Sequence, residues 1–368
     1  MDIEVVRTAL TQWRQVDLGS APLIDGQVRL KVDRFGFSSN NVTYAVMGEM
    51  LRYWEAFSAA ASAPSGDVVW GRVPVWGFAE VVESRVDAIA VGERLFGFLP
   101  MSTELVITPG KITETEIADA APHRAVLAAA YNNYRRCAKD PTYDAGLEDL
   151  QMLLYPLYFT SFVIDDFLVD HADFGASQVI ISSASAKTAI GAAQLLHGRS
   201  MRTVALTSEP NVEFCESLGV YDQVLTYDEI TDLEHTSAVF VDVAGNPHVV
   251  AAVHRHLAED LVHSMVVGDT HWDSAPAETA DPLPGPPQTF LFAPTQIKKR
   301  SQDWGAAELN AKMGAAWATF AAWASTWLDL ERVAGPEAVI EVFLGYLAGR
   351  VDPKVGTLCT MRTQEVAS

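Results

Sequence analysis

Cysteine and basic residues are scarce in this sequence of 368 residues. Its cysteines, Cys137, Cys215 and Cys359, are too few and too scattered for a disulfide framework or a C-x-x-C metal knuckle, which favours a reducing compartment. Lys and Arg number 26 against 47 Asp and Glu, so the formal net charge is -21. Because nucleic-acid affinity depends largely on basic side chains that neutralise phosphates, this charge argues against nucleic acid or an anionic membrane as a partner.

The sequence also lacks the patterns that are typical of a secretion signal and of a membrane-spanning helix. Residues 1–15 have neither the basic flank nor the apolar run of a secretion signal. Residues 152–168 are apolar, but the run contains Pro156 and is shorter than the ~20 residues that span a bilayer. We therefore expect a cytoplasmic protein.

The patterning that is present predicts a two-domain α/β protein. The sequence is 49% hydrophobic and 20% charged, as in ordinary globular proteins, and it is longer than the ~100 to 200 residues of one domain. Residues 1–122 read as short strands between turns, and apolar and polar positions alternate over residues 26–38, which predicts a small β-barrel. Residues 123–140 and 159–171 read as helices.

Strands and helices alternate from residue 178 onward. Strands that alternate with helices of this kind indicate βαβ units around a parallel sheet. The predicted parallel strands cover residues 178–182, 202–208, 223–227, 237–245 and 264–270. A proline-rich segment then precedes a short strand at 289–294 and a long helix at 306–326, and the chain closes with further strands and a helix.

In this order the elements resemble the medium-chain dehydrogenase/reductase superfamily, in particular a divergent bacterial branch of its zinc-free, quinone-oxidoreductase-like members. Residues 77–98, "GFAEVVESRVDAIAVGERLFGF", are similar to the barrel signature of that family, and residues 175–196 are similar to its cofactor turn. The resemblance implies a Rossmann-type doubly wound parallel sheet plus a GroES-like β-barrel domain. It divides the chain into a GroES-like catalytic domain (1–122), a Rossmann dinucleotide-binding domain (123–326) and a C-terminal return to the catalytic domain (327–368).

The zinc ligands of the related dehydrogenases are missing. Those enzymes need thiolate, imidazole and carboxylate ligands at a catalytic zinc and clustered cysteines at a structural one. Neither set is present in this sequence. The expected enzyme is therefore metal-free.

The turn that follows the first parallel strand lacks the glycines of a dinucleotide-binding loop. The resemblance places Ser183, Ala186 and Ala189 where glycines usually stand. Ser183 and Ala186 are small enough for the backbone to approach a pyrophosphate, and alanine is an accepted variant at the helix-packing position of Ala189. Lys187 either offsets phosphate charge at a helix N-terminus that already favours anions or is a solvated surface lysine. The residues predicted to contact the cofactor in this turn are Ser183, Ser185, Ala186, Lys187 and Thr188.

The end of the second parallel strand indicates which dinucleotide is bound. Thr207 and Ser208 stand where NAD-preferring folds commonly carry an acidic residue for the ribose hydroxyls. Hydroxyls without a negative charge favour NADP(H), although Glu209 follows closely. NAD(H) is thus the less favoured cofactor.

Further cofactor contacts are expected in other segments. Thr160 resembles the start of the helix beside the nicotinamide, or else is an ordinary N-cap. Ala244 and Gly268 lie in loops after parallel strands, where ligands of such sheets bind. Lys298, in the basic run 298–300, either closes over cofactor phosphates or an acidic substrate, or belongs to a solvated loop.

The predicted catalytic residues follow a barrel strand. Asn40, Asn41 and Tyr44 stand where related enzymes place side chains that face the nicotinamide. A phenol or amide donor can stabilise the oxyanion that hydride transfer creates, and a tyrosine can protonate it. The structural alternative is a turn formed by the two asparagines with a half-buried tyrosine packed beside it.

The residues and the resemblance together predict a metal-free NADP(H)-dependent reductase that transfers hydride to a carbonyl or activated alkene of a small quinone-like or enone-like molecule. The alternative is a cofactor-free binding or scaffold protein that retains the reductase fold with a degenerate dinucleotide site. We also expect a homodimer, because residues 289–294 are similar to the edge strand that related reductases pair across a two-fold axis.

Overall fold

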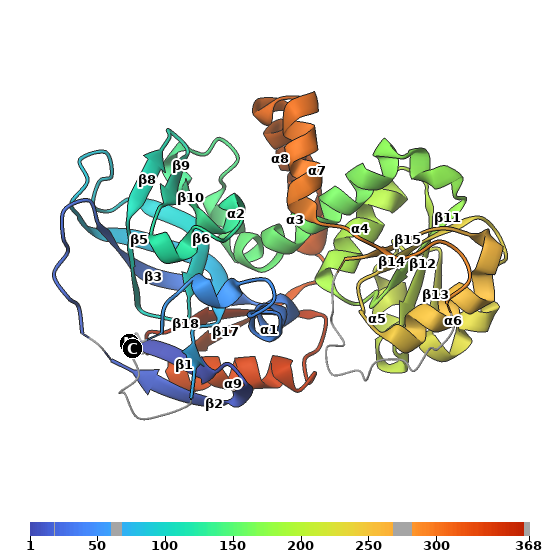
Figure 1. Ribbon diagram of the computed structural model, residues 1–368, viewed down its shortest axis with the longest axis horizontal. Coiled ribbons are helices and arrows are strands. Elements are labelled where there is room, and N and C mark those ends of the chain that lie inside the picture. The colour runs from blue at the N-terminus through green and yellow to red at the C-terminus, as the bar shows by residue number, and fades with distance from the viewer. Residues whose placement is uncertain (18, 60–67, 268–281, 364–368) are drawn as a thin grey trace. The chain divides into compact units, whose positions relative to one another are not determined.

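By internal contacts the protein forms two compact units (Figure 1). Unit 1 is Met1–Leu153 together with Asp329–Ser368, and unit 2 is Leu154–Leu328. The computed structural model describes residues 1–17, 19–59, 68–267 and 282–363.

Unit 1 is built mainly of antiparallel strands. Its strands are β1 (Asp2–Val6), β2 (Ala9–Val16), β3 (Val28–Phe37), β4 (Trp70–Gly71), β5 (Pro74–Ser84), β6 (Arg94–Pro100), β7 (Glu104–Ile107), β8 (Pro109–Ile112), β9 (Glu116–Asp119), β10 (Asn133–Arg136), β17 (Asp329–Ala334) and β18 (Val355–Thr360). The larger sheet has the order β17-β18-β3-β5-β6-β10-β9-β8, with β7 paired to β3, and the smaller has the order β2-β1-β4. Its helices are α1 (Ser39–Val46), α2 (Ala129–Asn132) and α9 (Pro336–Leu347).

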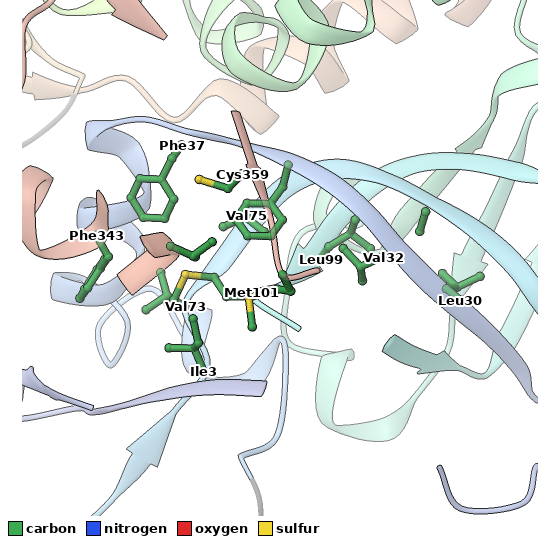
Figure 2. Packing of buried hydrophobic residues seen from close by; sticks show 14 of the residues in the cluster. Ile3, Leu30, Val32, Phe37, Val73, Val75, Leu99, Met101, Phe343 and Cys359 are labelled. Carbon is green, nitrogen blue, oxygen red and sulfur yellow. The ribbon is translucent and has the colours of Figure 1, made fainter. Parts of the chain in front are cut away.

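The core of unit 1 follows from alternation along its strands (Figure 2). Leu30 and Val32 of β3 are almost fully buried, whereas Lys31 between them is exposed. Successive side chains of a strand point to opposite faces, so the apolar ones gather on one side. Figure 2 shows these two residues in one cluster with Val75 of β5 and Leu99 of β6. The period-two pattern of residues 26–38 therefore predicted this strand correctly.

Residues 123–140 do not form the helix that their alanine-rich run predicts. The short helix α2 is followed at once by β10, which pairs with β6 and with β9. Arg136 at the end of β10 also forms an ion pair with Glu93. Strand pairing thus overrides local helix propensity here. These contacts place the segment with unit 1, while the functional domain boundaries of the sequence analysis stay a prediction.

A buried carboxylate anchors the start of the long helix α3 (Glu148–Asp170). Glu148 is 4% exposed and accepts two hydrogen bonds of 2.6 Å from the guanidinium of Arg94. Arg34 and Tyr143 each donate one more at 2.6 Å. Arg94 belongs to the barrel signature, and Gly92 two residues earlier has a φ of 87°, which favours glycine. The signature residues therefore shape the turn and hold α3.

Unit 2 contains a parallel sheet. Its strands are β11 (Gln178–Ser182), β12 (Arg202–Thr207), β13 (Gln223–Thr226), β14 (Ala238–Asp242), β15 (Leu261–Val266) and β16 (Thr289–Phe290). The order is β13-β12-β11-β14-β15-β16, with each neighbouring pair parallel. The direction of winding reverses between β11 and β14, which makes the ends of these two strands the topological switch point. The expected doubly wound sheet is confirmed.

Helices cover both faces of this sheet. They are α4 (Lys187–Gly198), α5 (Val212–Ser217), α6 (Pro247–Leu257), α7 (Ala293–Asp303) and α8 (Ala306–Ala324), together with α3. Val179 and Ile181 of β11 belong to one apolar cluster with Ile190 of α4, whereas Ile180 belongs to another with Val253 of α6. Both faces of the strand are thus buried, as in other doubly wound sheets.

Helix α3 is both long and apolar. Residues Ala145–Asp170 are long and apolar enough to cross a membrane by length and composition alone. Half of the relevant window is buried inside the protein, and Pro156 interrupts it. Tyr158 of α3 stacks on Phe320 of α8 with ring centroids 4.4 Å apart. Core helices of soluble proteins pass the same composition test, so this feature is weak evidence for a membrane span.

Candidate functional site

The turn between β11 and α4 has a glycine-like backbone although it contains no glycine. Ser183 has a φ of 51°, in the left-handed region that favours glycine. Its N–H donates to the hydroxyl of Tyr227 at 3.1 Å. The N–H of Ala184 donates to the carbonyl of Leu206 at 3.1 Å, and its own carbonyl accepts from the hydroxyl of Tyr221 at 2.7 Å. The turn is therefore held from three neighbouring segments of unit 2.

A buried polar pair joins the ends of β11 and β14 at the switch point. The hydroxyl of Ser182 donates to Asp242 Oδ1 at 2.7 Å and accepts from the N–H groups of Val243 and Ala244 at 2.9 and 3.0 Å. Burial raises the pKa of Asp242, while hydrogen bonds from Ser182 and the Gly245 N–H act in the opposite direction. Ala244 was predicted as a cofactor contact from the sequence, whereas Asp242 was not. An acid that ends a parallel strand before a glycine-containing loop is the signal that points to it.

The first turn of α4 carries Lys187 and Thr188. Its N-cap is Ala186, an alanine whose side chain makes no capping bond. The Thr188 carbonyl accepts from Ser161 Oγ at 2.7 Å. Thr160 precedes Ser161 in the middle of α3, so it is neither the start of that helix, as the resemblance implied, nor an N-cap. A helix start with a lysine and without a side-chain cap attracts anions.

The end of β12 brings two hydroxyls together. Asn211 Nδ2 donates to Ser208 Oγ and to Ser185 Oγ, both at 3.1 Å. Because the amide supplies both protons, each hydroxyl keeps its own proton for a further acceptor. Thr207 is 1% exposed, so its side chain is buried at the end of the strand. The sequence analysis named Ser185, Thr207 and Ser208 but missed Asn211, which lies three residues beyond Ser208.

The basic run 298–300 lies on helix α7, which excludes the alternative that it belongs to a solvated loop. The buried guanidinium of Arg300 forms ion pairs with Asp166 at 2.7 Å and with Asp170 at 3.1 Å. The Lys299 ammonium bonds to Asp170 at 2.7 Å. Carboxylates of α3 therefore neutralise most of this positive charge. Lys298 is exposed on the same helix, and its contact with a cofactor stays a prediction.

The predicted catalytic tyrosine lies in an aromatic cluster of unit 1. Trp76 Nε1 donates to the Tyr44 hydroxyl at 3.0 Å, and the hydroxyls of Tyr53 and Tyr131 lie 3.0 Å apart. The Tyr44 ring packs edge-on against Tyr53 and Phe98, with centroid distances of 4.7 and 5.1 Å. Burial, reinforced by the nearby Tyr131, raises the pKa of Tyr44 far above its usual value. The phenol is thus protonated at neutral pH.

The two asparagines before Tyr44 have different surroundings. Asn41 is 3% exposed, and its Oδ1 accepts from the Ser38 N–H at 2.8 Å while its Nδ2 donates to the Pro74 carbonyl at 2.9 Å. This reciprocal arrangement with Ser38 is a capping box at the start of α1. The Asn40 side chain acts to lower the pKa of Tyr44 against the larger effect of burial. Asn41 therefore positions the helix, and a catalytic role of Asn40 stays a prediction.

Metal-ligand clusters do not occur in the part of the chain that the structure describes. Within those residues, no group of three or more His, Cys, Asp or Glu is arranged to hold an ion. Gly268, which was predicted to contact the cofactor, lies outside the described residues.

A mainly antiparallel β unit combined with a doubly wound parallel sheet is the fold that the resemblance to medium-chain dehydrogenases/reductases predicts. CurA from Vibrio vulnificus in complex with NADPH is similar to it with a TM-score of 0.60, 12% identity and 99% of both chains covered. The yhdH oxidoreductase from Salmonella enterica in complex with NADP is similar with a TM-score of 0.51, 14% identity and 95% of both chains covered. A mutant form of enoyl thioester reductase from Candida tropicalis gives 0.52 and 10%, covering 98% of this chain and 100% of that one. At these identities the similarity shows the fold, and it confirms the predicted resemblance to this superfamily.

Within that class, the chain belongs to the family described as "Protein of unknown function (DUF2855)", whose sequence profile matches residues 35–352. The match runs from β3 through both units to the segment before β18. No curated protein matches the sequence.

Proposed function

We propose that the protein is a metal-free reductase that uses NADP(H) to transfer a hydride to a carbonyl or an activated alkene of a small quinone-like or enone-like molecule. The observation that carries the proposal is the β11–α4 turn, in which Ser183 has a φ of 51°. A non-glycine residue in this region costs free energy, and such residues persist where function or the surrounding structure requires them. Similar structures that contain NADPH or NADP support the choice of cofactor.

The start of α4 would hold the pyrophosphate in this proposal. Its N–H groups point out of the helix beyond β11, at the switch point where parallel sheets bind ligands. Lys187 in the first turn adds a positive charge next to them. Ala189 and Gly191 are buried on the side of α4 that faces the core, and a Cβ on Gly191 would lie 2.5 Å from Ser161 Oγ. Small residues thus allow α4 to pack closely and bring its N-terminus to the strand ends.

The choice of NADP(H) rests on the pair of hydroxyls at the end of β12. Ser185 and Ser208, aligned by Asn211, can both donate to one anionic group. A phosphate on the adenosine ribose is such a group, whereas a carboxylate here would select the unphosphorylated ribose. Glu209 follows in the chain, but its side chain is exposed.

Tyr44 is the proposed proton donor. When bound, NADPH supplies the hydride, and the reduced substrate then needs a proton on oxygen or carbon. The Tyr44 oxygen already accepts from Trp76 Nε1, so its own proton is directed elsewhere. The same indole donor stabilises the phenolate that proton transfer leaves behind, and Asn40 lowers the pKa of Tyr44 in the same direction.

The experiment that tests the proposal is a fluorescence titration of the protein with NADPH and with NADH, using its nine tryptophans as the reporter. We expect NADPH to bind at least about tenfold more tightly, which equals about 1.4 kcal/mol, because the extra phosphate gains charge-assisted hydrogen bonds. Asn211→Asp should remove this preference, since a carboxylate would repel the phosphate. Asn310→Asp, which adds the same charge on the exposed face of α8, is the matched control.

The cofactor-free alternative makes the opposite prediction in the same titration. If neither dinucleotide binds at millimolar concentration, the turn is a remnant and the proposed reductase activity falls with it. Equal affinities, or tighter binding of NADH, would instead show that the hydroxyl pair does not select the phosphate.

We also propose a homodimer formed through the edge strand β16. Phe290 of β16 is 62% exposed at the open edge of the parallel sheet, and Phe292, the N-cap of α7, is 49% exposed. An exposed apolar edge strand invites pairing with another strand. Light scattering should give about 80 kDa, twice the 40.0 kDa of one chain, and Phe290→Glu should halve it. Val91→Glu, a comparably exposed site in unit 1, should leave the mass unchanged. A mass near one chain at every concentration would refute the dimer.

A further inference from the structure

The serine of the cofactor turn is bound by a tyrosine from a distant part of unit 2. Among residues 182–186, Ser183 alone has a positive φ, and its N–H donates to the Tyr227 hydroxyl at 3.1 Å. A glycine would adopt this conformation without steric cost, whereas a serine must be held there by other contacts. The bond to Tyr227 acts directly on the residue that carries the strain.

Tyr227 is itself fixed at the end of β13. It follows Thr226, whose N–H and hydroxyl both donate to the Glu229 carboxylate, at 2.9 and 3.0 Å, in a capping box. Its half-buried ring packs against the apolar cluster between the sheet and α6. Burial is the largest cause that raises the pKa of Tyr227, to about 12, so its oxygen is a neutral acceptor at physiological pH. The hydroxyl is therefore a rigid point to which the turn is attached.

We propose that Tyr227 is a positioning residue that takes over the role of the missing glycine, by holding Ser183 in the left-handed conformation that keeps the β11–α4 turn open for a dinucleotide. The ligand part of this inference rests on the proposed function. The conformational part does not, because it concerns a bond within the folded protein. Tyr221 assists from the other side by donating to the Ala184 carbonyl at 2.7 Å.

A double-mutant cycle separates this role from direct contact between Tyr227 and the ligand. The variants are Tyr227→Phe, Ser183→Gly and the double variant, each made in the full chain. If the tyrosine holds the serine, its hydroxyl matters only while residue 183 is not glycine. Tyr227→Phe should then lower the thermal midpoint by about 2 to 4 °C in the parent, and by less than about 1 °C in the Ser183→Gly background.

Binding of NADPH is the second measurement on the same variants. Tyr227→Phe should raise the dissociation constant about tenfold in the parent and less than about twofold in the Ser183→Gly background. Tyr346→Phe is the matched control, because it removes a phenol hydroxyl that donates to the Phe37 carbonyl in unit 1. It should leave NADPH binding unchanged in both backgrounds.

Each outcome decides the inference. Equal losses from Tyr227→Phe in both backgrounds would show that Tyr227 acts by another route, such as contact with the ligand, and would overturn it. No loss of thermal midpoint in the parent would overturn it as well. If the parent binds no dinucleotide, the proposed function fails, but the thermal cycle measured without ligand still tests whether Tyr227 holds Ser183.

Discussion

We expect Glu148→Gln to lower the free energy of unfolding by about 3 kcal/mol at pH 7, the largest stability change predicted for this chain. The carboxylate accepts four hydrogen bonds of 2.6 Å from Arg94, Arg34 and Tyr143 while it is 4% exposed. Glutamine keeps the shape but not the charge, so two guanidinium groups lose the partner they share. Urea unfolding followed by fluorescence measures the difference.

The dependence on pH gives this prediction a second test. Burial alone would raise the pKa of Glu148, but the hydrogen bonds from Arg94, Tyr143 and Arg34 outweigh it and lower the pKa from 4.5 to about 2. A carboxylate with a lowered folded pKa stabilises the protein fully above its unfolded pKa, and this contribution is lost as pH falls from 4.5 towards 2. The shift corresponds to a stabilisation on the order of 3 kcal/mol.

The parent should therefore lose stability steeply below pH 4.5, and Glu148→Gln should lose less over the same interval. Glu341→Gln, at an exposed position on α9 in the same unit, is the matched control and should follow the parent. Parallel pH profiles for the parent and Glu148→Gln would contradict the assignment of the lowered pKa to this carboxylate.

The sequence predicted the fold well where local pattern and tertiary structure agree. Alternation in residues 26–38 and the strand–helix order after residue 178 both correspond to observed elements. The helix predicted for residues 123–140 was wrong. Strand β10 forms there because it pairs with β6 and β9, and a local alanine-rich pattern carries no information about such pairing. The positive charge of residues 298–300 was visible in the sequence. Its carboxylate partners were not, because they lie on α3, more than a hundred residues earlier.

The candidate site was only partly predictable for the same reason. The absence of glycine at Ser183 is visible in the sequence, whereas the tyrosine that binds its N–H stands 44 residues later. Asn211 and Asp242 were missed because their partners lie far earlier in the sequence, Ser182 at the end of β11 and Ser185 in the turn that follows it. The role of Asn41 was readable locally, since a serine and a hydrogen-bonding side chain three residues apart are typical of a capping box.

The largest effect on activity is expected for Tyr44→Phe. If Tyr44 donates the proton, removal of its hydroxyl should lower kcat about 10² to 10⁴-fold, the usual contribution of a positioned general acid. The fold should persist, because the ring keeps its edge contacts with Tyr53 and Phe98. Dinucleotide affinity should also persist, because the proposed cofactor contacts lie in unit 2. The loss should thus appear in kcat while the dissociation constant of NADPH is unchanged.

Tyr53→Phe is the matched control for this prediction. It removes a hydroxyl from the same cluster, one that bonds to Tyr131 and not to Tyr44, so kcat should fall much less. The dependence of kcat on pH is a second test, because it would not change if Tyr44 had only a packing role. Burial raises the pKa of Tyr44 far above neutrality, so the parent should show a flat kcat between about pH 6 and 8. The residual activity of Tyr44→Phe should rise as pH falls, because the proton must then come from solvent. A Tyr44→Phe variant with the parent's kcat and the same flat profile would remove Tyr44 from the mechanism and leave it as a packing residue of the barrel.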